Sequence, residues 1–226
     1  MGQARRACQG HPRPGGRARA RPRGELAFPA QSSINACAAH YCPDETDETA
    51  YGEDDLVKID IGAHVEGYVA DNAVTVATGK HWKEHITASQ DALKAAIKAA
   101  VPGASPRDIG AEIEAAIQSH GLEPIRNLSG HGIGHYAIHC EPSIPNYPSP
   151  ADQTPLTEGQ TIAIEPFATN GAGLIHSKGT ATIFMLRGTV TPRSQHARDI
   201  LKTITAYQGL PFTTRWLTRI HGRAKA

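Results

Sequence analysis

The alternation of apolar and polar residues predicts a β-hairpin in the first half of the chain. Residues 56–62 read LVKIDIG, and residues 67–79 form a second run rich in valine and threonine. Two such runs separated by a short stretch are typical of antiparallel strands joined by a tight turn. We place the centre of this turn at Val65 and Glu66, which pairs the two runs residue by residue.

Helical spacing of apolar residues follows in three segments. The first begins near Trp82 and ends at Pro102-Gly103, and the second begins at Ser105-Pro106, a typical helix start. The third spans residues 194–207. The expected buried stripes are Trp82, Ile86, Leu93, Ile97 and Val101 in the first helix, Ile109, Ile113 and Ile117 in the second, and Ala197, Ile200, Leu201 and Ile204 in the third.

Shorter segments complete the assignment of the fold class. Residues 122–150 are rich in Gly, His and Pro, which predicts loop and short strand. Residues 161–169, interrupted by Pro166, and residues 180–188 are further strand candidates. Helices that are separated from antiparallel hairpins along the chain are typical of the α+β class.

Composition narrows the possible functions. Of the 226 residues, 39% are hydrophobic and 20% charged, as in a globular protein, and no apolar run is long enough to cross a membrane. Aromatic residues make up 5%, too few to favour a surface for base stacking. The four cysteines show no CxxC spacing, so we expect free thiols in a reducing compartment and a cytoplasmic protein. They are Cys8, Cys37, Cys42 and Cys140.

The formal net charge of +1 is unevenly distributed. Residues 1–24 hold seven arginines and no acid, with Pro and Gly throughout, which predicts a disordered basic tail. The remainder has a formal charge of −6, so we expect no specific nucleic-acid partner. Residues 44–55 contain seven acids in twelve positions, and we interpret them as a solvated loop.

Two aspartates interrupt the apolar runs of the predicted hairpin. With the turn at Val65 and Glu66, Asp60 and Asp71 lie directly opposite, with Cβ atoms roughly 4.5–5.5 Å apart on one face. Two carboxylates at this distance on a buried face repel each other, so either one of them is neutralised or both bind cations. In the alternative, one acid caps the turn and the other faces solvent.

Three histidines follow at intervals of four residues. The glycines around His131, His135 and His139 make a helix unfavourable, and in an extended chain the three share one face. The alternative is a glycine-rich turn with solvated histidines, which we favour for His135.

A later acid completes a possible metal site. Glu165 follows the apolar residues Ile-Ala-Ile, so we expect it to be half-buried and to need a partner. Asp60, Asp71, His131 and Glu165 together offer oxygen ligands and one imidazole, a set that suits Mn, Fe, Co or Zn. Bridging carboxylates can hold two such ions and activate a water between them.

Four motifs in the same order resemble type 2 methionine aminopeptidases, the archaeal and eukaryotic kind. They are AFPAQSSINACAAHYCP (27–43), LVKIDIGAHVEGYVADNAVTV (56–76), NLSGHGIGHYAIH (127–139) and AIEPF (163–167). The resemblance extends from about residue 25 to the end. It implies a pita-bread fold, an antiparallel sheet backed by helices, and removal of the initiator methionine from new polypeptides by a metal-bound hydroxide.

The resemblance also implies roles for single residues. Asp60 would bind one metal and Asp71 would bridge two. His131 and Glu165 would complete the coordination of the second metal, with Glu165 also the proton shuttle. The implied cofactors are two divalent ions.

Four further residues are implied to contact the substrate. His40 and His139 would flank the scissile amide, and Phe28 and Ile138 would wall the apolar methionine pocket. The implied partners are peptides with an N-terminal methionine, which are the substrates. We expect a monomer with no membrane partner. Association with the ribosome is left open.

One departure concerns the C-terminal part. The family's last ligand is a second bridging glutamate, whereas no Asp or Glu follows Asp199. We expect a basic tail (1–24), a catalytic domain incomplete at its C-terminal end (25–188) and the start of the type 2 helical insertion (189–226). We also expect this polypeptide to bind one ion weakly and to be poorly active, unlike its full-length parent.

Two other functions share the pattern. One is a related dipeptidase that cleaves before proline, which usually carries a leading domain. The other is a metal-free binding protein on the same fold, acting through RNA or protein contacts, for which the ligands should be substituted.

Overall fold

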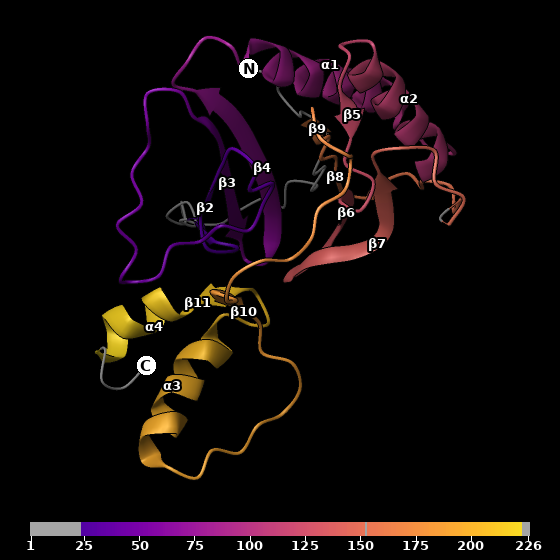
Figure 1. Ribbon diagram of the computed structural model, residues 1–226. Helices are drawn as coiled ribbons and strands as arrows, with labels where there is room; N and C mark the ends of the chain where they lie inside the picture. Colours follow the sequence, from indigo (N-terminus) through magenta and orange to yellow (C-terminus); the bar gives the residue numbers. More distant parts are fainter. Residues whose placement is uncertain (1–23, 152, 223–226) are drawn as a thin grey trace, which may run out of the picture.

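The computed structural model describes residues 24–151 and 153–222 (Figure 1). The predicted tail therefore lies outside the described residues, apart from Gly24. The elements are β1 (Glu25–Leu26), β2 (Gln31–Ile34), β3 (Leu56–Val65), β4 (Tyr68–Ala77), α1 (Lys83–Ala99), α2 (Pro106–Gln118), β5 (Glu123–Pro124), β6 (Ser129–Gly134), β7 (Ala137–Pro145), β8 (Ile162–Ala163), β9 (Ala168–Thr169), β10 (Ile183–Phe184), α3 (Gln195–Ala206), β11 (Phe212–Thr213) and α4 (Thr214–His221). The α+β assignment is confirmed.

The predicted hairpin is β3–β4, but its turn lies one residue later than expected. Glu66 and Gly67 form the turn with φ of +51° and +84°, and Val65 pairs with Tyr68. A two-residue turn with positive φ at both central positions matches the twist of the strands it joins. Asp60 therefore faces Ala73 and Asp71 faces Gly62. The prediction that the two aspartates lie directly opposite each other is wrong.

The hairpin belongs to a four-stranded antiparallel sheet. β1 and β2 pair with successive parts of β3, and β4 pairs with its other edge. The face opposite the two aspartates exposes large apolar side chains. They are Ile61, Val65, Tyr68, Val74 and Val76, and among the described strands β4 pairs with β3 alone.

A second antiparallel sheet has the order β7-β6-β8. It contains the segment that we predicted as loop and short strand, and β7 alone spans nine residues. Glycine is required here by close backbone approach, because a Cβ on Gly130 would lie 2.2 Å from the carbonyl oxygen of Ala163. The predicted strand at 161–169 is split into β8 and β9 on either side of Pro166, and the one at 180–188 is reduced to β10.

Helices α1 and α2 lie side by side and pack on β5, β7 and β9 (Figure 1). The predicted start of α2 is confirmed: the Asp108 backbone N–H donates to the Ser105 side chain. Its stripe, Ile109, Ile113 and Ile117, is fully buried as expected.

The buried face of α1 differs from the prediction. It consists of Ala88, Ala92 and Ala96, whereas Ile97 and Val101 are 57% and 52% exposed. Small alanine side chains let the two helices approach closely, so the face of α1 that packs against α2 is the alanine face rather than the face with the largest apolar side chains.

The C-terminal part consists of α3, β11 and α4. β11 pairs with β10, and Leu217 of α4 is buried. The apolar residues predicted for α3 are only half-buried. The boundary predicted between residues 188 and 189 stays a prediction.

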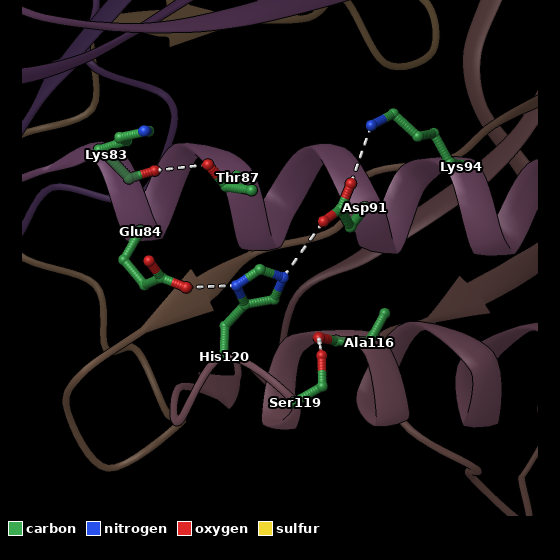
Figure 2. A network of polar contacts seen from close by, with 8 residues as sticks. All are labelled: Lys83, Glu84, Thr87, Asp91, Lys94, Ala116, Ser119 and His120. Atoms are coloured by element: carbon green, nitrogen blue, oxygen red, sulfur yellow. Dashed lines mark hydrogen bonds and ion pairs between the residues drawn. The ribbon is translucent and has the colours of Figure 1, made fainter.

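His120, just beyond α2, links the two helices (Figure 2). Its Nδ1 contacts Glu84 of α1, and its Nε2 lies 3.2 Å from the Asp91 carboxylate. Carboxylates only accept hydrogen bonds, so both ring nitrogens must donate and the ring is an imidazolium. Chiefly through the hydrogen bond to Glu84, these contacts raise the pKa of His120 above its ordinary value.

Replacing His120 with glutamine should therefore destabilise the protein in a pH-dependent way. A group with a raised pKa stabilises the fold fully below its unfolded pKa and loses that effect as the pH rises through its folded pKa. The difference in unfolding free energy between the two proteins should thus be largest near pH 5 and shrink toward about pH 9. Urea unfolding across this range measures it, and a difference that grows with pH would contradict the assignment.

Candidate metal centre

The two hairpin aspartates share the inner face of β3–β4 as diagonal neighbours. Asp60 and Gly62 point to one side of β3, and Gly62 is the partner of Asp71. Diagonal positions on one face remain within reach of polar side chains that converge on a common point. The predicted shared face is therefore present, although the pairing is shifted by two residues.

His131 lies at the centre of the second sheet, where β6 is paired on both edges. Its Nδ1 donates to the Gly132 carbonyl oxygen at 3.0 Å. Its Nε2 lies 3.0 Å from Glu165 Oε1 and 3.7 Å from Asp71 Oδ2. Because the backbone contact keeps the proton on Nδ1, Nε2 is directed at the carboxylates, the usual arrangement of a metal-binding histidine.

Three of the four predicted ligands converge. One ligand atom each from Asp71, His131 and Glu165 lies within 4.8 Å of the other two. Asp60 is outside this group of three, but its Oδ1 is buried and has no hydrogen-bond partner. A buried carboxylate oxygen without a partner is costly unless a cation or a proton satisfies it.

The electrostatics of the aspartates reflect this crowding. Burial, and then the charges of Asp71 and Glu165, raise the pKa of Asp60 to about 7. Burial, and then Glu165, raise the pKa of Asp71 to about 6. Burial works to lower the pKa of His131, but the hydrogen bond to Glu165 and the nearby carboxylates outweigh it and raise that pKa. Each aspartate thus holds its charge at a cost that a divalent cation would remove.

This donor set fits a divalent metal ion. It joins three carboxylates to one oriented imidazole, with a buried oxygen that no protein group satisfies. Oxygen and nitrogen donors of this kind suit Mn, Fe, Co or Zn.

The histidines of the loop and of β7 are placed differently from the prediction. His139 lies on β7 rather than in line with His131, and the hairpin brings the two rings to a centroid distance of 4.4 Å. Burial, and then the neighbouring His131, lower the pKa of His139. His135 lies in the turn, is exposed, and donates from Nε2 to the Glu66 carbonyl oxygen at 2.7 Å.

His40 lies near His139, close enough for its charge to lower that pKa. Its backbone has φ of +65°, and its N–H donates to the Gln31 side-chain oxygen at 2.8 Å. Gln31 is 7% exposed and pairs with Asp60 across β2 and β3. Gln31 was not predicted from the sequence, because its strand reads QSSI and the polar residues beside it give no sign that the amide is buried.

The predicted pocket walls are buried in one cluster. Phe28 and Ile138 are 4% and 3% exposed and pack with Ala27 and Leu210. The Phe28 ring lies over Gly62, the partner of Asp71. Both predicted walls thus lie beside the carboxylates, and their contact with a substrate stays a prediction.

Comparison with known proteins identifies a family of metal-dependent peptidases. The profile of metallopeptidase family M24 matches residues 10–191. The chain belongs to metallopeptidase family M24. In the part that the structure describes, no helix is both long and apolar enough to span a membrane.

Curated relatives of this M24 chain include several methionine aminopeptidases. The one from Archaeoglobus fulgidus is 46% identical over 194 residues, and the one from Thermococcus onnurineus is 47% identical over 195 residues. These matches cover 85% and 86% of this chain and 66% of each relative. Methionine aminopeptidase 2 of Neurospora crassa is 38% identical, with 86% of this chain and 47% of that protein covered. The chain thus spans about two thirds of the length of its archaeal relatives.

Solved structures confirm the pita-bread fold, of which this chain covers a part. The crystal structure of methionine aminopeptidase from Thermotoga maritima has a TM-score of 0.60 at 32% identity, covering 66% of this chain and 60% of that one. Prolidase from Pyrococcus furiosus has a TM-score of 0.54 at 29% identity, covering 62% and 41%. A thermophilic Arx1 covers 91% and 66% with a TM-score of 0.73, but at 15% identity it shows the fold alone.

Substituting Gly62 with alanine tests the packing beside Asp71. A Cβ at this position would lie 2.1 Å from the Phe28 ring, so the ring must move, and we expect a loss of about 1–3 kcal/mol of stability. Chemical denaturation measures the loss. Gly24→Ala is the control, because its Cβ meets only the His64 carbonyl oxygen at 3.7 Å. Equal stability of the two variants would contradict the contact.

Proposed function

We propose that this chain carries the metal centre of a methionine aminopeptidase, which removes the N-terminal methionine from polypeptides. The observation that carries the proposal is the convergence of Asp71, His131 and Glu165 beside the unpartnered oxygen of Asp60. The names of the curated relatives, at 46% and 47% identity, support the choice of reaction within the family.

Asp60, Asp71, His131 and Glu165 are the proposed metal ligands, and the resemblance implies that Asp71 would bridge two ions. Divalent cations in such a site acidify a water and polarise the peptide carbonyl. The ligand set is compatible with one or two ions, and two is the number implied by the resemblance.

The protein's own groups supply the remaining chemistry. Glu165, 33% exposed, is the most accessible of the three converging ligands and is proposed to take the proton from the attacking water and return it to the leaving amine. His139 and His40 are proposed to donate hydrogen bonds to the carbonyl oxygen as negative charge develops on it. The lowered pKa of His139 leaves it neutral near pH 7, with one N–H to donate.

Specificity for methionine is proposed to come from Phe28 and Ile138. Both are held by the buried cluster with Ala27 and Leu210, so the wall that they form is rigid. A rigid apolar wall favours an unbranched apolar side chain over a polar one. A monomer, a cytoplasmic location and ribosome association stay predictions, the second supported by the free thiols of Cys37, Cys42 and Cys140.

Asp71→Asn should weaken metal binding. Loss of a group that merely supports a ligand costs about 10–100-fold in affinity, so loss of a ligand should cost at least about 100-fold. Titration calorimetry with Mn²⁺ or Co²⁺ measures affinity and stoichiometry, and Glu48→Gln, an exposed acid outside the centre, is the control. If Asp71→Asn stabilises the metal-free protein but leaves metal uptake unchanged, the aspartate pair has a structural origin and the metal site is wrong.

Methionine release tests the reaction itself. The metal-loaded chain should release methionine from Met-Ala-Ser, at the low rate that we expect for this polypeptide, and leave an X-Pro dipeptide intact. Glu165→Gln should lower the rate by about 10²–10⁴-fold. Amino-acid analysis of the products measures both. Preferential cleavage of the X-Pro dipeptide would replace the proposal by the dipeptidase alternative.

A further inference from the structure

A cavity of about 610 Å³ lies between the β3–β4 turn and the C-terminal helices. Its lining comes from several parts of the chain that are distant in sequence: β1, the end of β3, the β6–β7 turn, the segment after α3, and α4. The four proposed metal ligands are not among its lining residues. The cavity is therefore distinct from the centre described above, and its volume is in the range of ligand-binding pockets.

Aromatic rings form much of the wall. Tyr207 and Trp216 lie with ring centroids 5.6 Å apart at 59°, and Tyr136 lies 5.5 Å from the ring of His64. All three aromatic side chains are half-buried, and burial raises the pKa of Tyr207. The cavity thus presents several partly desolvated aromatic faces, which attract cations.

The charged side chains of the lining are acidic. Glu25 and Glu66 contribute carboxylates, and among the residues that the structure describes no lysine or arginine lines the cavity. His64 adds no positive charge, because its Nδ1 accepts a hydrogen bond from the Gly67 N–H at 3.1 Å and so carries a lone pair. The lining therefore combines a negative charge with aromatic surface.

The cavity is built on a packed base rather than on a loose surface. Leu210, which lines it, is 3% exposed and packs against Phe28 and Ile138. The Tyr136 backbone N–H donates to the Gly67 carbonyl oxygen at 2.9 Å, which holds one aromatic wall to the β3–β4 turn. A preformed cavity loses little conformational entropy when it binds a ligand.

We propose that this cavity binds the guanidinium group of an arginine in a separate basic peptide. A planar guanidinium can stack on the aromatic faces while its N–H groups donate to Glu25 or Glu66. A lysine ammonium offers no plane to stack and is more strongly hydrated, so it binds more weakly here. The charge complementarity of the lining is the reason for choosing a basic ligand, and the proposal is independent of the metal-dependent reaction.

Tryptophan fluorescence of the full chain tests the proposal. Trp82→Phe leaves Trp216 as the single tryptophan, and the probe is the acetylated, amidated tripeptide Gly-Arg-Gly. The control peptide carries citrulline in place of arginine, because citrulline has nearly the shape of arginine but no charge. We expect the arginine peptide to bind at least about tenfold more tightly than the citrulline peptide, with or without a metal chelator.

Glu66→Gln in the same background should reduce the affinity for the arginine peptide about fivefold or more, and Glu48→Gln should leave it unchanged. Equal affinity of the two peptides, or no change of Trp216 emission with either, overturns the proposal. The proposal is also overturned if added peptide has no effect while replacing Arg17, Arg19, Arg21 and Arg23 with glutamine shifts the emission. In that case the chain's own arginines occupy the cavity.

Discussion

The rest of the site depends on three carboxylates brought together around one imidazole. Asp60 and Asp71 come from one hairpin, Glu165 from the chain after β8, and His131 from the strand between β7 and β8. In the described part of the chain, none of these carboxylates forms an ion pair with a lysine or arginine. Asp71 and Glu165 contact His131 instead. Negative charge that folding concentrates in this way is a strong reason to bind a cation.

The surrounding structure maintains this concentration by restricting movement. Glycine at position 130 lets β8 approach β6, which brings Glu165 to the ring of His131. Glycine at position 62 gives the Phe28 ring the space beside Asp71. The same two small residues thus set both the spacing of the ligands and the position of an apolar wall.

Much of the fold and of the site could be predicted from the sequence, because side-chain alternation and helix capping are local. The shared face of Asp60 and Asp71 depends only on parity, so a turn misplaced by one residue changed their pairing but not their side of the sheet. The turn position itself depends on the positive φ of Glu66 and Gly67; Gly67 is a turn signal in the sequence, whereas Glu66 gives none. The alanine face of α1 and the contacts of His120 with residues 36 and 29 positions away depend on tertiary packing, so local patterns could not predict them.

The apolar outer face of the β3–β4 hairpin favours self-association at high protein concentration. Val74 and Val76 are 52% and 43% exposed on a ten-residue strand whose second edge has no partner among the described strands. Backbone N–H and C=O groups on this edge, beside exposed valines, can pair with a β-strand of a neighbouring molecule. Self-association through this strand would leave the carboxylate face free, since the two sets of side chains point to opposite sides of the same sheet.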